Sequence, residues 1–171
     1  MAVRLSIALV FFVEVVDSVA GVFGVNRVGV RLSPYGTFND MGDSHPVELF
    51  TYVLDQLSKR GIAYVHVIEP RATAAGGGGA GDEHAPNTTE IFRKLFKGIF
   101  IFTGGYKFKD AKHAVETNQV DAVAFGWNFI ANPDLPERFK MNAPLNVYDR
   151  STFYGGGSVG YTDYPAMQDR R

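Results

Sequence analysis

Short apolar stretches alternate with helix-like stretches along the chain, and this alternation constrains the fold more than any other feature. The apolar stretches lie near residues 26–32, 62–68, 98–103 and 121–126. Each is followed by a segment in which apolar residues recur at helical spacing. No antiparallel hairpin signal separates them, so we expect four parallel strands joined by helical crossovers. Four such units could form an open sheet or half of an eight-stranded barrel, and in either case the carboxyl ends of the strands carry the site.

Composition favours one compact globular domain over residues 1–171. Of the 171 residues, 46% are hydrophobic and 20% are charged, and the formal net charge is −1. Lysine and arginine form no cluster large enough for nucleic-acid binding. Cysteine is absent, and the four histidines lie in different segments without the spacing of ligands on one helix. We therefore expect no metal site and no nucleic-acid partner.

The stretch at residues 1–24 can be interpreted in two ways. The stretch resembles a secretory signal, because it contains an arginine, an apolar run and small residues in that order. If the protein were secreted, Asn87 would become a glycosylation acceptor. An amphipathic helix is the favoured interpretation, because Glu14 and Asp17 interrupt the run. The residues expected on its apolar face are Leu5, Leu9, Phe12, Val16 and Val19. The run is too short to span a membrane, and we expect a cytoplasmic protein.

Three crossover helices are predicted between the strands, near residues 46–61, 87–98 and 108–118. The first ends at a glycine, which is the residue most often found just after a helix. The second begins with Asn87 followed three residues later by Glu90, a pattern typical of a capping box. The residues expected to be buried on the first and third helices are Val47, Phe50, Val53, Leu54, Leu57, Ala111, Ala114 and Val115.

Glycines follow two of the predicted strands. Gly104 and Gly105 end the third strand, where their backbone N–H groups can point at an anion without interference from a Cβ atom. Gly126 ends the fourth strand, and Pro133 favours a helix that starts near it. The glycine-rich run at residues 72–81 contains a GxGxxG spacing, but no helix opens there, so a flexible loop is the favoured interpretation.

Five separated segments resemble the C-terminal half of the Old Yellow Enzyme family, which includes the plant 12-oxophytodienoate reductases. The segments are RVGVRLSPYGTFNDMGDSHP, AYVHVIEPR, FTGGY, FGWNFIANPDLPERFKMNAPLN and TFY followed by GYTDYP. The resemblance covers about Phe12 to Met167. It implies an α/β fold in which the four units and a C-terminal tail are strands five to eight of a (β/α)8 TIM barrel. It also implies FMN, NAD(P)H as hydride donor, and reduction of the C=C bond of α,β-unsaturated carbonyl compounds.

The resemblance assigns roles to residues at the matching positions. Arg31, inside the first strand, matches an arginine at the pyrimidine end of the flavin, where a cation stabilises negative charge; an arginine paired with a carboxylate at the rim is the alternative. The proposed cofactor-binding residues are Arg31, Gly104, Gly105, Gly126 and Trp127. Those proposed to contact the enone substrate are Arg71, Phe153 and Tyr154, with a solvated loop charge and plain core packing as alternatives.

Two departures from the family pattern affect these expectations. Trp127 stands where the family has an arginine that binds the phosphate, and the loss of one charged hydrogen bond weakens FMN binding by about ten- to a hundredfold. Lys107 or Lys109 could compensate in part, and Trp127→Arg is expected to strengthen FMN binding. Strands one to four of the family barrel have no counterpart here, so no catalytic residue is assigned.

Three functions remain open after this comparison. The chain is an FMN-dependent ene-reductase or the FMN-binding half of one, a half-barrel that associates with itself or with a partner chain, or a truncated product without activity. A half-barrel exposes its inward apolar face and two sheet edges, which favours association. The residues expected on that face are Val28, Val30, Val65 and Val67 or their neighbours.

Overall fold

The computed structural model describes residues 2–37, 41–70 and 86–167, with the backbone alone for residues 2–8. It divides into two compact units, Met1–Ala124 and Phe125–Arg171. The single domain expected over residues 1–171 stays a prediction.

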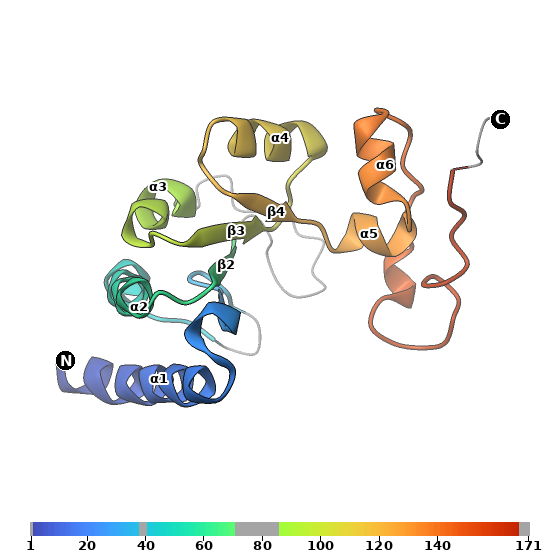
Figure 1. Ribbon diagram of the computed structural model, residues 1–171. Coiled ribbons are helices and arrows are strands. Elements are labelled where there is room, and N and C mark those ends of the chain that lie inside the picture. Colours follow the sequence, from blue (N-terminus) through green and yellow to red (C-terminus); the bar gives the residue numbers. More distant parts are fainter. Residues whose placement is uncertain (1, 38–40, 71–85, 168–171) are drawn as a thin grey trace. The chain divides into compact units, whose positions relative to one another are not determined.

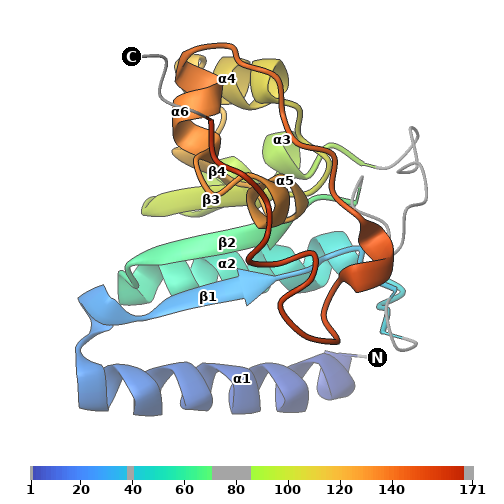
Figure 2. The same cartoon turned by 90° about the vertical axis from the view of Figure 1, so that its right-hand side faces the viewer.

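A four-stranded parallel sheet forms the centre of the first unit. The strands are β1 (Gly29–Leu32), β2 (Tyr64–Ile68), β3 (Ile99–Thr103) and β4 (Ala122–Ala124), in the spatial order β1-β2-β3-β4. Figure 2 shows β1, β2 and β3 side by side in one layer. The four predicted strands and their parallel pairing are confirmed, with each strand shorter than expected at one end or both.

Helices join the strands and cover one face of this sheet (Figure 1). The chain begins with α1 (Ala2–Phe23) and a short 3-10 turn, η1 (Val25–Arg27). The crossovers contain α2 (Pro46–Arg60), α3 (Thr88–Phe92) continued by η3 (Arg93–Leu95), and α4 (Phe108–Glu116). The N-cap half of the predicted capping box is confirmed, because the Asn87 side chain accepts hydrogen bonds from the N–H groups of Thr89 and Glu90. Gly61 ends α2 in the left-handed conformation.

The core lies between the sheet and the crossover helices. It contains Val65 and Val67 of β2 and Phe100 and Phe102 of β3, all with 0% exposure, packed with Leu54 and Leu57 of α2. The four valines expected on the inward face of a half-barrel therefore face the core instead: Val28, Val65 and Val67 are buried and Val30 packs against the core. Their neighbours, the alternative named with them, occupy the opposite face. Continuous apolar strands do not reveal which alternate set faces the helices, because both sets are apolar.

The opposite face of the sheet is lined by the alternate residues. Tyr64, His66 and Ile68 of β2 alternate with the buried valines, and Ile99 and Ile101 occupy the same face of β3. Tyr64 is 39% exposed and Ile99 is 53% exposed. We refer to this surface as the open face.

The amphipathic interpretation of the first helix is confirmed for three of the five residues expected on its apolar face: Leu9 and Val16 are buried and Phe12 packs against the core. The prediction was wrong for Val19, which is 39% exposed near the end of the helix. The side chain of Leu5 lies outside the described residues. A bidentate ion pair fastens α1 to α2, with the Nε and Nη2 atoms of Arg60 at 2.6 and 2.9 Å from the two carboxylate oxygens of Asp17. No helix among the described residues is long and apolar enough to cross a membrane.

Two burial predictions for the crossover helices were wrong. Val47 is 44% exposed and Val115 is 40% exposed, whereas the other predicted apolar residues of α2 and α4 are buried or packed against the core. Both valines lie on the edge of an apolar stripe, where a side chain covers the core only partly.

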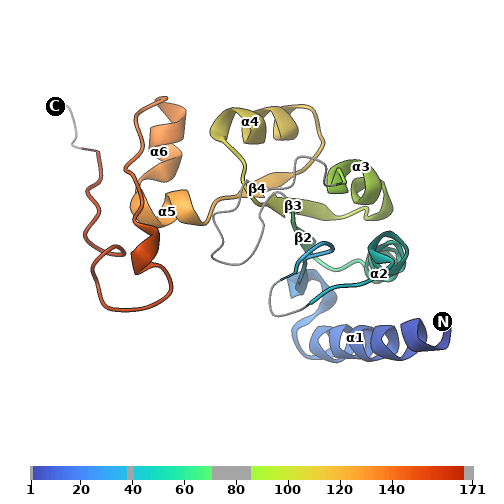
Figure 3. The ribbon, with the colours of Figure 1, turned by 180° about the vertical axis from the view of Figure 1, so that it is seen from behind.

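The second unit consists of two short helices and the C-terminal tail (Figure 3). The helices are α5 (Trp127–Ala131) and α6 (Leu135–Lys140), and a 3-10 turn follows, η4 (Arg150–Thr152). The helix expected near Pro133 is α6, but α5 was not predicted. The buried Asn132 separates the helices, and its side chain accepts a hydrogen bond from the N–H of Asn146 at 2.7 Å.

Candidate functional site

The carboxyl ends of β3 and β4 lie together in the first unit. The Thr103 hydroxyl donates a hydrogen bond of 2.9 Å to the backbone carbonyl of Ala124, which fixes the ends of the two strands against each other. Directly after Thr103 the backbone takes positive φ at two successive residues, 118° at Gly104 and 68° at Gly105. Residues with a Cβ atom rarely adopt these values, so the turn requires glycine. Such a turn is suited to binding an anion through backbone N–H groups.

A buried carboxylate lies at the carboxyl end of β2. Glu69 is 3% exposed, and its Oε1 accepts a hydrogen bond of 3.1 Å from the hydroxyl of Thr89. The Glu69 N–H also donates to the Thr103 carbonyl at 2.8 Å, so this residue holds β2 against β3 beyond the strand pairing. The only sequence signal for it was its position directly after an apolar run.

Arg31 and His66 are paired across β1 and β2 on the open face. Arg31 is exposed and forms no ion pair with any residue that the structure describes, so the alternative of a carboxylate-paired arginine is not seen there. Burial lowers the pKa of His66 from its ordinary value of 6.5, and the nearby Arg31 charge lowers the pKa further. The Nε2 atom of His66 is buried and has no hydrogen-bond partner within the described ranges.

Arg71 and the glycine-rich run at residues 72–81 lie outside the described residues.

The second unit contains an aromatic cluster of four residues. The ring centroid of Trp127 is 5.9 Å from that of Tyr148 and 6.3 Å from that of Phe153. Phe153 also lies 5.6 Å from Tyr148 and 5.7 Å from Tyr154. Phe153 is half-buried within this cluster, whereas Tyr154 is 71% exposed. Tyr154 is therefore the one of the two with more surface available for a ligand.

Gly126 and Trp127 connect this cluster to the start of α5. Gly126 precedes the helix, and its carbonyl accepts the N–H groups of Phe129 and Ile130 at 2.9 and 3.1 Å. Nothing lies within 4 Å of where a Cβ atom on Gly126 would be placed. The close approach of another group is therefore possible at this turn.

Arg150 lies over the indole of Trp127, a relationship that the sequence did not reveal. The guanidinium carbon is 4.6 Å from the centroid of the Trp127 ring, within the range of a cation–π interaction. The two residues are far apart in the sequence and no spacing rule connects them, so only the folded tail brings them together.

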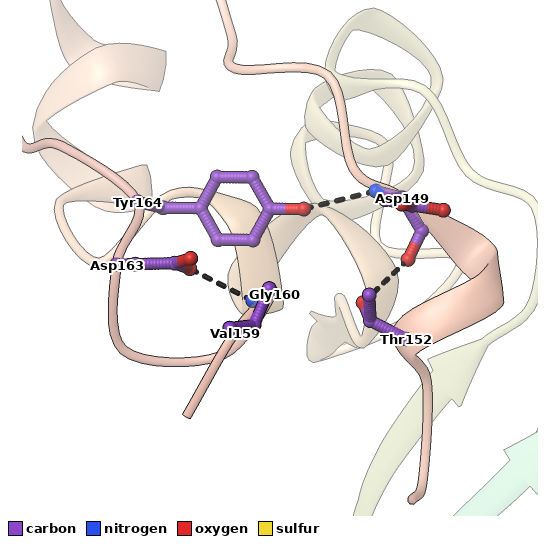
Figure 4. Close-up of a pocket in the computed structure, with 6 residues that line it drawn as sticks. All are labelled: Asp149, Thr152, Val159, Gly160, Asp163 and Tyr164. Atoms are coloured by element: carbon purple, nitrogen blue, oxygen red, sulfur yellow. Dashed lines mark hydrogen bonds between the residues drawn. The ribbon is translucent and has the colours of Figure 1, made fainter. Parts of the chain in front are cut away.

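A cavity of about 280 Å³ lies in the tail of the second unit (Figure 4). It is lined by Asp149, Thr152, Val159, Gly160, Asp163 and Tyr164. Its polar groups bond to one another: the Asp149 N–H donates to the Tyr164 hydroxyl oxygen at 2.9 Å, and Asp163 accepts the Gly160 N–H at 2.8 Å. These bonds maintain the fold of the tail, and we assign no ligand to the cavity.

Known proteins similar to this chain include plant reductases and solved structures of morphinone reductase. The chain is 46% identical to 12-oxophytodienoate reductase 2 of Arabidopsis thaliana over 159 residues, which is 92% of this chain and 41% of that protein. It is also 46% identical to putative 12-oxophytodienoate reductase 5 of Oryza sativa subsp. japonica over 161 residues, 93% of this chain and 42% of that protein. The chain thus spans about two fifths of the length of these relatives.

Solved structures of morphinone reductase are also similar to this chain, again over part of their length. One superposes with a TM-score of 0.82 at 47% identity and covers 93% of this chain and 41% of that chain. A morphinone reductase complex with tetrahydroNAD superposes with a TM-score of 0.81 at 45% identity, over 93% of this chain and 41% of that chain. The expected fold, part of a TIM barrel with four parallel strand-helix units, is confirmed. Residues 8–146 match the NADH:flavin oxidoreductase / NADH oxidase family, and the chain belongs to that family.

Proposed function

We propose that this chain is the FMN-binding part of an NAD(P)H-dependent oxidoreductase that reduces the C=C bond of α,β-unsaturated carbonyl compounds. Family membership over residues 8–146 supports a flavin oxidoreductase, and the plant relatives bear the name 12-oxophytodienoate reductase. When bound, FMN would accept a hydride from NAD(P)H and deliver it to the substrate. No catalytic residue of this chain is proposed.

The turn at Gly104 and Gly105 is the observation that carries the proposal. It lies at the carboxyl end of a parallel strand, where ligands bind in folds of this class, and it holds two successive glycines at positive φ. The backbone N–H groups of such a turn fit a phosphate, because no Cβ atom limits its approach. We propose that Gly104 and Gly105 contact the FMN phosphate. In the second unit, Gly126 and Trp127 are proposed as cofactor-binding residues.

Arg31 is proposed to face the electron-rich end of the flavin. It is exposed on the open face and has no carboxylate partner in the part of the chain that the structure describes, so its charge is available to a ligand. A cation in this place would favour negative charge on the bound cofactor. Arg71, Phe153 and Tyr154 are proposed to contact the enone substrate.

Flavin titration of the purified chain tests this proposal. FMN fluorescence should be quenched on binding, and Gly105→Ala should weaken binding because a Cβ atom is strained at a φ of 68°. Gly61→Ala is the matched control: Gly61 has a φ of 67°, lies at the end of α2, and has no atom within 4 Å of the added Cβ. Both variants should lose similar stability, whereas only Gly105→Ala should lose FMN affinity. Failure of the wild-type chain to bind FMN would contradict the proposal.

Arg31 can be tested in the same assay. Arg31→Gln should weaken the binding of FMN, and the exposed Arg27 of η1, at the amino end of β1, provides the control Arg27→Gln. Adding NADPH and an enone to the FMN-loaded chain then separates the remaining alternatives. Turnover supports an active ene-reductase, and FMN binding without turnover supports a cofactor-binding part that lacks the catalytic residues.

A second candidate function is association with a partner chain or a second copy through the open face. Its apolar residues Tyr64 and Ile99 are 39% and 53% exposed, and in the described sheet β1 and β4 are the edge strands. Such a surface favours association. Ile99→Lys should then raise the monomer fraction in light scattering at micromolar concentration, whereas Val22→Lys on the exposed side of α1 should not. A wild-type chain that stays monomeric and binds no hydrophobic dye would contradict this candidate.

A further inference from the structure

We infer that Arg150 binds the phosphate monoester group of FMN beside the turn at Gly126 and Trp127. This inference rests on the proposed function, and it adds a residue that neither the sequence motifs nor the family resemblance assigned. It starts from the stacked pair of Arg150 and Trp127 in the second unit. The guanidinium carbon lies 4.6 Å from the indole centroid.

The guanidinium of Arg150 has unused hydrogen-bond donors. Within the residues that the structure describes, its side chain donates no hydrogen bond and forms no ion pair. The adjacent carboxylate of Asp149 forms no ion pair with Arg150 among the described residues; its Oδ1 accepts the N–H and the hydroxyl of Ser151 at 2.9 and 2.7 Å. A half-buried cation with five N–H donors and no carboxylate partner is suited to bind an anion.

Stacking on Trp127 makes this cation more selective for a phosphate. A guanidinium that lies on an aromatic face keeps its N–H groups directed outward from its edge, and it loses little conformational freedom when it binds. Two parallel N–H donors of one guanidinium match two oxygens of a phosphate. The stack also explains how a tryptophan can occupy position 127 of a phosphate-binding turn, because its indole positions the arginine that comes from η4.

The fluorescence of Trp127 allows phosphate binding at this site to be measured without a flavin. Trp127 is the only tryptophan of the chain, so intrinsic fluorescence reports on the indole under Arg150. Inorganic phosphate added at constant ionic strength should change this fluorescence in the wild type and not in Arg150→Gln. Chloride at the same ionic strength is the control for a general salt effect.

Flavin binding gives the second readout. Arg150→Gln should weaken FMN by about ten- to a hundredfold, whereas riboflavin, which lacks the phosphate, should bind both proteins equally. Arg150→Lys keeps the charge but loses the planar pair of donors, so its FMN affinity should lie between those of the wild type and Arg150→Gln. Lys140→Gln removes an exposed charge of α6 and should change neither affinity.

The outcomes separate this inference from the proposed function. If the wild type binds neither FMN nor riboflavin, the proposed function fails. The change in tryptophan fluorescence with inorganic phosphate then still shows whether Arg150 binds a phosphate group. If FMN binds and Arg150→Gln binds it as tightly as the wild type does, the inference is overturned while the proposed function stands. Equal losses of FMN and riboflavin in Arg150→Gln would also overturn it, because the effect would then not involve the phosphate. Equal riboflavin binding by the variants shows that they are folded.

Discussion

Arg138 of α6 and Asp134, which directly precedes that helix, form an ion pair in which only the arginine is fully buried. The Arg138 Nε atom lies 2.6 Å from Asp134 Oδ1, and Arg138 is 5% exposed. The same guanidinium donates to the carbonyl of Pro144 at 2.7 Å and to that of Pro165 at 3.0 Å. Asp134 in turn accepts the N–H of Met167 at 2.6 Å. This one pair therefore fastens two separate parts of the tail to α6.

Arg138→Met is predicted to destabilise the second unit by about 1–3 kcal/mol, because it leaves the carbonyl groups of Pro144 and Pro165 without their donor. Limited proteolysis should then cut the tail sooner than in the wild type. The control Lys140→Met removes an exposed cation of the same helix and should change stability by less than about 0.5 kcal/mol. Equal proteolysis rates for Arg138→Met and the control would contradict this role.

The same pair predicts a loss of stability in acid. Burial opposes ionisation of Asp134, but hydrogen bonds from Arg138 and from the Met167 N–H outweigh it, so the pKa of Asp134 is lowered from 3.8. A lowered carboxyl pKa contributes stability that is present above the unfolded value and is lost as pH falls through the folded value. The tail should therefore become more sensitive to protease below about pH 4. In Asp134→Asn, protection should be weaker at pH 7 and should decline less below pH 4.

The strand-helix order of the first unit was predictable from sequence because the signals there are local. Apolar runs bounded by glycine and proline indicate strands, and an asparagine cap or a terminal glycine marks the end of a helix. Asn87 and Gly61 therefore had the predicted roles. Parallel pairing followed from the helix-like stretch after each strand and from the absence of hairpin signals between strands.

The assignment of sheet faces and of Arg150 was not predictable in the same way. In β2 both alternate sets contain apolar residues, so periodicity alone could not show that Val65 and Val67 face the helices. Arg150 reaches Trp127 only through the irregular tail, where no repeating pattern fixes the distance between residues. The helix α5 was not predicted, because Gly126 indicates a turn and the helix, at 5 residues, is too short to show a repeating apolar pattern.

Titration of His66 predicts a second effect of pH on stability, at a higher pH than the effect of Asp134. Burial, followed by the charge of Arg31, lowers the pKa of His66 below 6.5. The unfolded chain then binds the proton more readily than the folded chain, so stability declines as pH falls below about 6.5. Urea unfolding between pH 7.5 and pH 5 should show this decline in the wild type and a smaller one in His66→Gln. Arg31→Gln should also reduce it, because the positive charge beside His66 is removed; an unchanged profile in both variants would contradict the assignment.

Gly160 and Gly156 provide a matched pair for the packing of the tail. Both have positive φ, 77° and 82°, so alanine at either position costs about 1 kcal/mol in backbone strain. A Cβ atom on Gly160 would also lie 2.1 Å from Thr152 Oγ1 and 2.6 Å from Thr152 Cβ, whereas nothing lies within 4 Å of one on Gly156. Gly160→Ala should therefore lower the free energy of unfolding by about 1–3 kcal/mol more than Gly156→Ala does. Equal unfolding midpoints in urea would show that the tail adjusts without strain.

Coupling between positions 127 and 150 gives the sharpest test of the phosphate site. The sequence alone led us to expect that Trp127→Arg strengthens FMN binding, but the contact with Arg150 changes this expectation. The substitution adds a guanidinium, removes the stack under Arg150 and places two cations together, so FMN affinity should change by less than about threefold. In the Arg150→Gln background the new arginine has no competitor, and it should strengthen FMN by about ten- to a hundredfold relative to Arg150→Gln alone. The two substitutions should therefore be strongly non-additive. FMN and riboflavin titrations of the four proteins measure this, and riboflavin should show no coupling because it lacks the phosphate. Additive effects on FMN would mean that residues 127 and 150 do not act on the same phosphate group, and the gain from Trp127→Arg would then appear in full in the wild-type background.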